Sequence, residues 1–387
     1  MVLKSIAGFS IPSGKAASDP VSRVARALAL GLGLTTIAGT LLSLNPRPSW
    51  VFRIWDFPRL QLFAGALTAG AMFGSARTPR SAADLAFIGS LGITALIQGR
   101  KIAVYTPFWP VQVERSAKGG SDEARLRILV TNVLRENSCY QKLVNMIREH
   151  EPDVVLAVEV DGRWERELEG LAEDYPYIVR QPQENHFGMM LFSRLPLEDT
   201  RVEFLVQDDI PSVRTRIVLR SGDRVQLHGL HPRPPEPQHL QDSTPRDAEL
   251  VMVGREIGES EEQPTIVAGD LNDVAWSRTT QLFLRLSGLL DPRIGRGFYN
   301  SFNANQPLMR WPLDHIFHSR HFRLVSLRRL GKIGSDHFPM LAELSYQPEA
   351  LLSQNAPEAD PEDRRAAKKR VRMQRIEAGS GETRPSE

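Results

Sequence analysis

Cysteine is almost absent from this chain of 387 residues, which contains Cys139 alone. An intrachain disulfide is therefore excluded, and a bacterial cytosol fits the composition as well as an exported domain without disulfides. No cluster of cysteine and histidine has the spacing of a zinc site. The Gly-rich loop ending in Lys-Ser/Thr, which holds the phosphates of a nucleoside triphosphate, is missing too.

The chain also lacks a strong net charge, because 48 Lys and Arg residues against 46 Asp and Glu residues leave a formal charge of +2. This balance argues against a protein that coats nucleic acid along its whole surface. The charges are nevertheless unevenly spread. A cationic run from Arg364 to Arg375 lies in a polar tail, residues 348–387, which we expect to be disordered or a frayed helix. The tail is either solvated or in contact with anionic lipid or nucleic acid.

Long apolar stretches, in contrast, crowd the first hundred residues: Ala27–Leu44, Leu60–Ala76 and Leu85–Gln98. A helix needs roughly 20 apolar residues to cross a bilayer, which the first two approach and the third reaches only if flanking residues snorkel. We expect a cytoplasmic segment over residues 1–20 and a membrane domain of about three transmembrane helices over residues 21–103. A cleaved signal peptide and a soluble helical hairpin are the alternatives, but these stretches show no polar stripe.

Two further patterns support insertion into a membrane. Small residues at four-residue spacing favour close helix packing in lipid: Ala66, Gly70 and Gly74. Aromatic residues between the first two stretches are typical of an interfacial belt: Trp50, Phe52, Trp55 and Phe57. The cations before the first stretch place the N-terminus in the cytoplasm. Three spans then make a multi-pass cell-membrane protein whose remaining chain lies on the extracytoplasmic side. The cations Arg47, Arg53 and Arg59, however, favour the opposite orientation.

After a linker, residues 104–120, the pattern changes to short runs rich in Val, Ile and Leu that read as strands. The segment "YQKLVNMIREH" predicts an amphipathic helix, and Pro245–Ile257 predicts another. Many strands, few helices and no regular alternation favour an α+β fold over a doubly wound sheet. We therefore expect one α+β domain over residues 121–347.

Acidic, amide and imidazole side chains recur where these strands end, as Asn132, Glu159, His231, Asp270, Asn272, Asp314, Asp336 and His337. Hard divalent cations such as Mg²⁺ bind oxygen ligands, which Glu159 and Asp336 can provide. A further carboxylate, Asp270, suits the activation of a water molecule. A histidine held by a carboxylate, as in His337 with Asp314, suits proton transfer. Taken singly, each of these residues is more often a turn former or a structural group.

The ordered set resembles the endonuclease/exonuclease/phosphatase superfamily over about residues 125–346. The matching pieces, in order, are "TNV", "AVEV", "GMMLFSRLPL", "LHGLHP", "GDLND", "PLDHIF" and "GSDHFP". The resemblance implies a four-layer sandwich, two packed β-sheets with helices outside, that hydrolyses phosphoesters with Mg²⁺ or Mn²⁺. It also implies that Asn132, Glu159 and Asp336 lie at the metal. Asp270 would orient the water, and Asn272 and His231 would hold the phosphate. His337 would stabilise developing charge and be oriented by Asp314.

Departures from the family pattern bear on the substrate. Thr131 stands where many family nucleases have Trp, and no long basic insertion separates His231 from Asp270. The segments "HPRPPEP" and "RWPLDHIF" look like the bacterial membrane-linked branch, similar to glycopeptide-resistance-type phosphatases. We expect a lipid-linked or small phosphoester as substrate, contacted by Arg310 and Asn303, with membrane lipid as the other partner and no obligate protein partner. The alternatives are a membrane-tethered nuclease, whose rim would include Arg293, Arg296 and Arg310, and a degenerate scaffold without activity.

Overall fold

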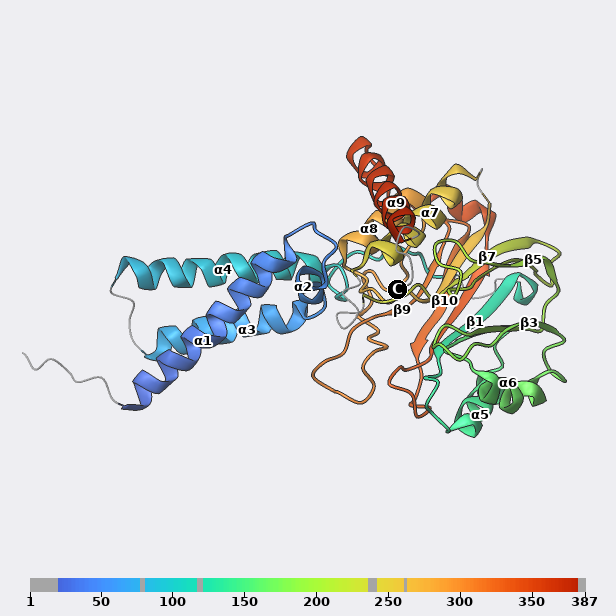
Figure 1. Ribbon diagram of the computed structural model, residues 1–387, viewed down its shortest axis with the longest axis horizontal. Coiled ribbons are helices and arrows are strands. Elements are labelled where there is room, and N and C mark those ends of the chain that lie inside the picture. The colour runs from blue at the N-terminus through green and yellow to red at the C-terminus, as the bar shows by residue number, and fades with distance from the viewer. Residues whose placement is uncertain (1–19, 77–80, 117–120, 236–241, 261–262, 382–387) are drawn as a thin grey trace, which may run out of the picture. The chain divides into compact units, whose positions relative to one another are not determined.

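The computed structural model describes residues 20–76, 81–116, 121–235, 242–260 and 263–381. The chain forms two compact units (Figure 1). The first comprises residues 1–41 and 60–98, and the second comprises residues 42–59 and 99–387. The predicted cytoplasmic segment, residues 1–20, lies outside the described residues except for Pro20.

The first unit is built by three helices, α1 (Pro20–Ser43), α3 (Arg59–Ala76) and α4 (Ala82–Ala103). Small and apolar side chains pack between α3 and α4, where Ala66 and Ala69 meet Leu91 and Ala95. The predicted small-residue face is thus present at Ala66, whereas a side chain added at Gly74 would meet open space. A buried hydrogen bond from Gln98 Nε2 to Thr40 Oγ1, 2.8 Å long, satisfies two polar groups in this apolar unit.

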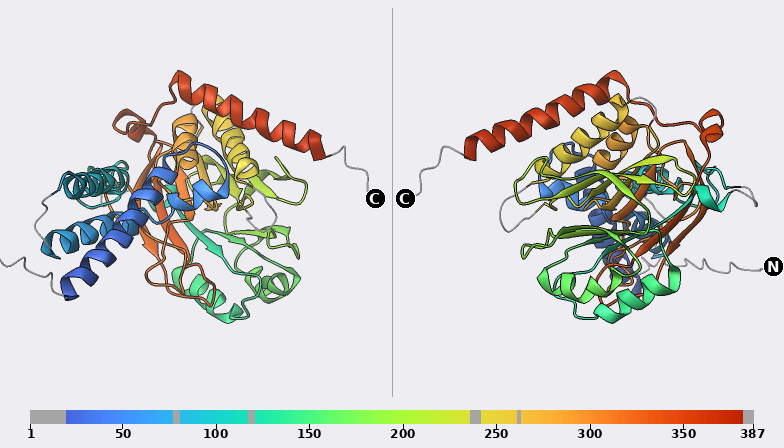
Figure 2. Two further views of the ribbon diagram at one scale, coloured as in Figure 1. Left: turned by 60° about the vertical axis from the view of Figure 1, so that its left-hand side comes forward. Right: turned by 90° about the vertical axis from the view of Figure 1, so that its right-hand side faces the viewer.

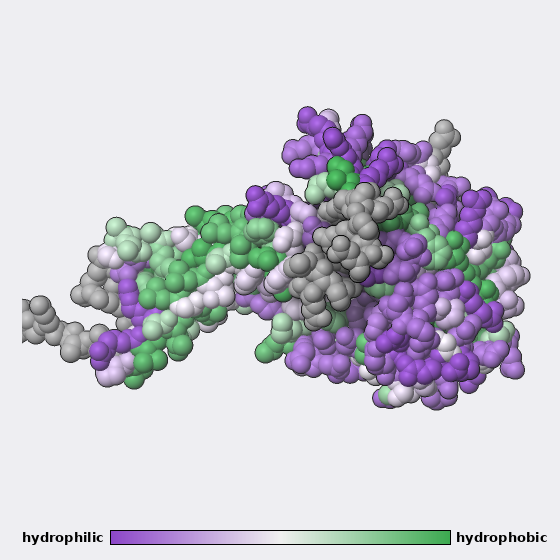
Figure 3. Space-filling view, in the orientation of Figure 1, coloured by the Kyte–Doolittle hydropathy of each residue, from purple (hydrophilic) through white to green (hydrophobic). Residues whose placement is uncertain are grey.

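The outer surface of these helices is apolar, as Figure 3 shows by the hydrophobic residues gathered over them. Leu28 on α1 is 61% exposed and Leu96 on α4 is 64% exposed. Among the described helices, α1 and α4 are long and apolar enough to cross a membrane, and the 18-residue α3 is not among them. The third predicted stretch, Leu85–Gln98, is therefore long enough to cross a membrane, because its helix continues beyond the apolar run, from Ala82 to Ala103.

The second unit contains two β-sheets. The first has the order β10-β11-β1-β2-β4-β3 and the second the order β5-β6-β7-β8-β9. The strands of the first sheet are β10 (Phe322–Arg329), β11 (Met340–Tyr346), β1 (Arg125–Asn132), β2 (Val154–Val158), β4 (Met189–Ser193) and β3 (Tyr177–Gln181). Those of the second are β5 (Leu197–Glu203), β6 (Ser212–Val218), β7 (Arg224–Leu230), β8 (Thr265–Asp270) and β9 (Asp314–His318).

The two sheets pack face to face around the main core, to which Ile128, Leu156, Leu227 and Ile266 contribute. Helices α5 (Tyr140–His150) and α6 (Gly162–Leu168) cover the outer face of the first sheet. Helices α7 (Thr244–Glu259) and α8 (Arg278–Ser287) cover the second, as the edge-on view in Figure 2 shows. The predicted α+β four-layer sandwich is confirmed.

Two segments that the sequence left outside this domain belong to it. The predicted linker buries Tyr105 and Val113 completely and hydrogen-bonds to β10, where Leu324 N donates to Glu114 O at 2.9 Å. The expectation of a disordered tail is wrong for Pro361–Gly381, which form helix α9, in agreement with the alternative of a helix. One face of this helix is apolar although the segment is rich in cations, and that face packs Ala367 and Val371 against α7 and α8. Residues 382–387 lie outside the described residues.

The segment between the first two apolar stretches, Leu42–Arg59, also packs in the second unit; we call it the inter-helix segment. It contains α2 (Trp50–Arg53) and a short 3-10 turn, Ile54–Asp56. Trp276 Nε1 donates to Asp56 O at 2.7 Å, and Ser243 N donates to Pro48 O at 3.1 Å. The ring of Phe57, predicted to lie in an interfacial belt, instead meets the edge of Trp311 at 5.6 Å.

Candidate active site

Strand direction brings the predicted site residues to one edge of the sandwich. Strands β1 and β2 are parallel, so that Asn132 at the end of β1 lies beside the residues that follow β2, among them Glu159. Strands β7 and β8 are parallel too, and β9 runs against β8 with Asp314 opposite Asp270. The loop before β11 returns to the same edge because β11 is antiparallel to β1.

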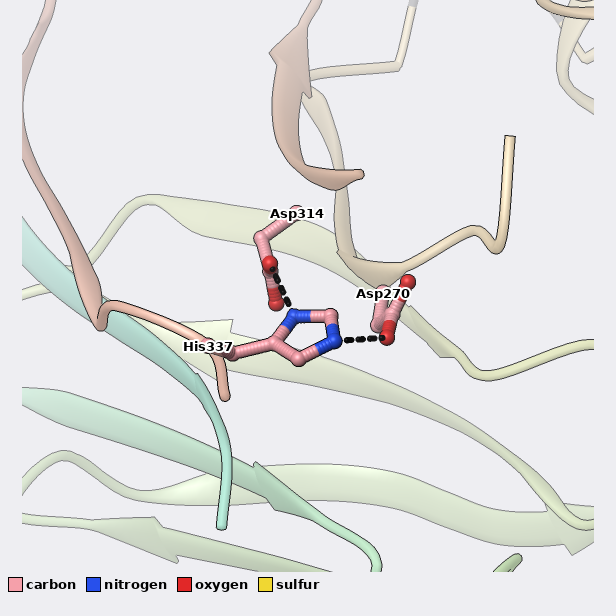
Figure 4. A group of neighbouring side chains, drawn as sticks. All are labelled: Asp270, Asp314 and His337. Carbon is pink, nitrogen blue, oxygen red and sulfur yellow. Dashed lines mark hydrogen bonds and ion pairs between the residues drawn. The ribbon is translucent and has the colours of Figure 1, made fainter. Parts of the chain in front are cut away.

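The centre of this site is the imidazole of His337, which lies between two carboxylates (Figure 4). His337 Nδ1 donates to Asp314 Oδ2 at 2.7 Å, and Nε2 lies 3.6 Å from Asp270 Oδ2. All three side chains are buried. The hydroxyl of Ser301 accepts the backbone N–H of Asp314, and that of Ser335 accepts the N–H of His337, so that both residues are held at fixed positions.

The electrostatics favour a protonated His337. Burial alone would lower its pKa, but Asp314 and Asp270 outweigh burial and raise the pKa of His337 to about 10. Burial would raise the pKa of Asp270, yet His337, His231 and the hydrogen bonds from Asn272 and Asn132 bring this pKa below its ordinary value. The pair therefore consists of an imidazolium beside an ionised carboxylate that can accept a proton from water.

The predicted metal ligands lie on the other side of Asp270. Asn132 Nδ2 donates to Glu159 Oε1 at 2.8 Å and to Asp270 Oδ2 at 3.1 Å, while Asn132 Oδ1 accepts from Leu134 N. In this orientation Asn132 joins the two carboxylates. Burial raises the pKa of Asp336, His337 opposes this rise, and the negative charge of Glu159 adds to it.

These carboxylates fit a divalent cation, because crowded oxygen ligands with unbalanced negative charge are what a hard cation binds. Asp270, Asp314 and His337 also place potential ligand atoms within 4.8 Å of one another. However, both ring nitrogens of His337 already face carboxylates, so we place the cation at Glu159 and Asp336 and leave the His337 group to proton transfer.

Two predicted phosphate-binding groups border Asp270. His231 Nε2 lies 4.0 Å from Asp270 Oδ2, and its Nδ1 is buried without a hydrogen-bond partner among the described residues. Asn272 N donates to Asp270 Oδ1 at 2.9 Å, and Asn272 Nδ2 donates to Pro232 O at 3.0 Å. Since a side-chain amide carries two N–H groups, one remains for a phosphate oxygen.

Sequence reasoning missed a buried cation that supports this loop. Arg246 of α7, 1% exposed, donates through Nη1 to Asn272 O at 2.6 Å and through Nη2 to Asp247 Oδ1 at 3.0 Å. Its Nη2 lies 3.6 Å from Asp273 Oδ2. Burial alone would lower the pKa of Arg246, but Asp273 and Asp247 raise it. The sequence signal was an Arg-Asp pair, Arg246 and Asp247, on the helix predicted over Pro245–Ile257.

The predicted substrate-binding residues lie in the loop before β9. Arg310 donates to the carbonyl groups of Asn303 and Ala304, both at 3.3 Å, and its guanidinium covers the ring of Phe338. Ala304 N donates to Asp336 O at 2.6 Å, which fixes this loop beside the site. Asn303 Oδ1 accepts from Asn305 N, so that its oxygen serves the loop.

A family model identifies the relatives of this chain. Residues 129–337, more than half of the chain, match the model of the Endonuclease/Exonuclease/phosphatase family. None of the curated proteins compared with the chain matches it. Similar solved structures include D. rerio TDP2 complexed with a single-strand DNA product, at 19% identity, covering 57% of this chain and 99% of that chain with a TM-score of 0.49. Another is the human Nocturnin catalytic domain with bound sulfate anion, at 17% identity, covering 58% of this chain and 95% of that chain with a TM-score of 0.48.

The family match and the buried acidic and histidine cluster concern the same residues, since the match spans Asn132 to His337. Members of this family are hydrolases that act on phosphoesters with divalent metal ions. The chain belongs to the endonuclease/exonuclease/phosphatase family and is a metal-dependent phosphoester hydrolase.

Proposed function

We propose that this protein is a membrane-anchored phosphatase or phosphodiesterase that uses Mg²⁺ or Mn²⁺ and acts on a lipid-linked or other small phosphoester at the bilayer surface. One observation carries the proposal. Three ring contacts join the site to the inter-helix segment: His337 to Phe302 at 4.9 Å, Phe302 to Trp311 at 6.2 Å, and Trp311 to Phe57 at 5.6 Å. Phe57 is followed two residues later by Arg59, the first residue of α3.

Membrane insertion is supported by the exposed apolar faces of α1 and α4, which water would solvate poorly. The inter-helix segment and residues 99–387 form one compact unit, so both lie on the same side of the membrane. Between Arg59 and Gly99 the chain therefore crosses an even number of times, and α3 and α4 either both span or both stay out. With α1 spanning, the N-terminus and the catalytic unit lie on opposite sides, as three spans require.

Within the site each residue has a defined task. Asp270 accepts the proton of the attacking water, and His231 and Asn272 hold non-bridging phosphate oxygens. The imidazolium of His337, oriented by Asp314, stabilises the charge that develops on the phosphoryl group. Glu159 and Asp336 would hold a divalent cation, which would neutralise charge on the phosphate and lower the pKa of bound water, while Asn132 positions the carboxylates of Glu159 and Asp270 through its Nδ2.

The nuclease alternative loses two of its candidate contacts. Arg293 is buried, donating to Asp291 and to His315 Nδ1, and Arg296 donates to the carbonyl groups of Pro292 and Val113. Both guanidinium groups thus stabilise the fold instead of following a phosphate backbone. Of the predicted basic rim, Arg310 remains beside the site.

The test is a substrate panel with the full chain in detergent and Mg²⁺. We expect release of phosphate from a short polyprenyl diphosphate, no cleavage of plasmid DNA, and loss of activity with EDTA or in Asp270→Ala. Cleavage of DNA with no action on the lipid would reject the proposed substrate class. For the topology, a single cysteine introduced at Thr78 or Arg47 in a Cys139→Ser background should react with an impermeant thiol reagent from opposite sides. Labelling from one side contradicts the paired crossing of α3 and α4.

A further inference from the structure

A cavity of about 490 Å³ opens beside helix α9, and none of the proposed catalytic residues lines it. Its walls come from the inter-helix segment (Pro46–Pro48), from α7, from the start of α8 and from α9. Four cationic side chains line it, Arg47, Arg278, Lys369 and Arg370, against two acidic ones, Asp247 and Glu362. We call it the α9 cavity.

The cations of the α9 cavity are only partly neutralised by the protein. Asp247 already accepts hydrogen bonds from Ser243 Oγ at 3.1 Å and from Arg246. Asp247 Oδ2 lies 3.9 Å from Arg370 Nε, and the side chain of Arg370 is 21% exposed. Burial lowers the pKa of Arg370, Asp247 opposes this, and the like charge of Arg278 adds to the lowering. A bound anion would relieve this repulsion.

The cavity is also rigidly built. Ala367 is fully buried on Val251 and Leu282, and Arg285 holds Asp363 through two hydrogen bonds of 2.6 and 2.8 Å. Helix α9 therefore presents Lys369 and Arg370 from a fixed position. On the opposite wall, Arg278 donates to the carbonyl of Leu44, which ties α8 to the chain that leaves α1.

Chain length places this wall close to the membrane. Pro46 follows Ser43, the last residue of α1, by three residues, which reach at most about 10 Å. The headgroup layer on each side of the hydrocarbon core is roughly 5–8 Å thick. If α1 spans the bilayer, Arg47 lies at the depth of the lipid phosphates, where a cation attracts anionic headgroups.

We propose that the α9 cavity binds the phosphate of an anionic phospholipid headgroup. The occupant follows from the excess of cations, from the fixed position of α9 and from the short connection to α1. The inference depends on the membrane insertion of α1 proposed above but not on the hydrolase reaction. It assigns to the cationic run of α9 a lipid contact separate from the catalytic site.

Binding can be measured on the full chain, purified in detergent and freed of lipid, by titration with dioctanoyl phosphatidylglycerol. Dioctanoyl phosphatidylcholine and inorganic phosphate serve as the other two probes. We expect saturable binding of the anionic lipid, with neither of the other two competing at equal concentration. Equal binding of phosphatidylcholine rejects the charge argument, and full competition by inorganic phosphate rejects the lipid as the occupant.

A matched pair of variants locates the site. Arg47→Gln with Lys369→Gln removes two exposed cations from the α9 cavity. Arg364→Gln with Lys368→Gln removes two exposed cations of the same helix that line a neighbouring cavity of about 700 Å³. We expect the first pair to weaken binding about 30-fold, which corresponds to about 2 kcal/mol, and the second to change it by less than about threefold. Equal weakening by both pairs, or none by the first, overturns the proposal.

Because lipid binding is measured without turnover, its outcome is independent of the substrate panel. A chain that binds the lipid and hydrolyses no phosphoester contradicts the proposed function alone. A chain that hydrolyses the lipid-linked substrate without binding phosphatidylglycerol contradicts the α9 cavity alone.

Discussion

The catalytic unit should not fold when it is cut at the borders that the sequence suggests. A fragment of residues 121–347 lacks the inter-helix segment, the stretch 99–116, and helix α9. A second fragment keeps all three: it joins Leu42–Arg59 to Gly99–Glu387 through a short Gly/Ser linker that replaces most of α3 and α4. We expect this second fragment to be stable and active, and the first to be unfolded or strongly destabilised.

The size of the effect follows from the contacts that the shorter fragment loses. Tyr105 and Val113 are fully buried, and burial of such side chains contributes about 1.5–3 kcal/mol each. Tyr105 Oη donates to Ala275 O at 3.0 Å, and Trp276 Nε1 donates to Asp56 O. Trp276 Nε1 is then left unsatisfied, which adds about 1–3 kcal/mol, whereas Ala275 O keeps the hydrogen bond from Gln281 Nε2 at 2.8 Å. The total approaches the 5–15 kcal/mol that holds a typical domain together.

The assay is thermal unfolding followed by circular dichroism, with phosphoesterase activity measured in parallel. The linked fragment should unfold cooperatively, and the Tyr105→Ala variant of that fragment should unfold at a lower temperature, since each kcal/mol lowers Tm by roughly 2–4 °C in a domain of this size. If residues 121–347 unfold cooperatively at the same temperature as the linked fragment, the packing of the outer segments contributes little and the reasoning fails.

Three further outcomes are expected. Asp270→Ala and His337→Ala should each lower turnover by at least about 10²-fold, the usual scale for losing a general acid or base, and near-normal kcat in either would remove that residue from its role. Arg246→Met leaves the buried carboxylates of Asp247 and Asp273 without their cation and should lower the free energy of unfolding by about 3–5 kcal/mol. Urea denaturation measures the loss, and Arg255→Met on the same helix, where the side chain is 40% exposed, is the control. Burial lowers the pKa values of His228 and His318 to about 4, below 6.5 in the unfolded chain, so that the unfolded state binds more protons. Stability should then be complete above pH 6.5 and fall by about 2 kcal/mol per histidine at pH 5, a loss that replacement by Gln should remove.

The residues that form the site were predictable because they follow a simple rule of sheets. Each lies at one end of a strand or within a few residues of it: Asn132 and Asp270 end β1 and β8, whereas Asp314 begins β9. Strand ends that meet at the same edge bring such residues together. The helix Tyr140–His150 was predicted with the bounds that the structure gives it, since its apolar residues repeat at helical spacing. The roles of Asn132 and Asn303 were harder to predict. An amide side chain can hydrogen-bond to its own loop or to a ligand, and the sequence does not distinguish the two.

Other elements escaped prediction for identifiable reasons. Strand β10 contains a β-bulge between Leu324 and Ser326 and carries three arginines, so its apolar residues do not alternate regularly with polar ones. Helix α9 has a narrow apolar face within a cationic segment, so that composition did not distinguish disorder from a helix. The support that Arg246 gives to Asn272 joins residues 26 positions apart, and only the packing of α7 against the loop after β8 brings them together.

The inter-helix segment shows how a correct local pattern can conceal its use. Its aromatic residues have the composition of a belt at a membrane interface. The same composition suits packing against another part of the protein, because both environments place apolar rings beside polar groups. What separates them is the buried charge beside the rings: Asp56, 1% exposed, accepts hydrogen bonds from Arg53 and Arg59. Water at a membrane surface would solvate these groups freely. Their burial beside Trp276, three residues beyond Asp273, indicates that the segment is part of the wall of the active-site loop. The inter-helix segment is therefore a packed part of the catalytic unit and not a free connection between two helices.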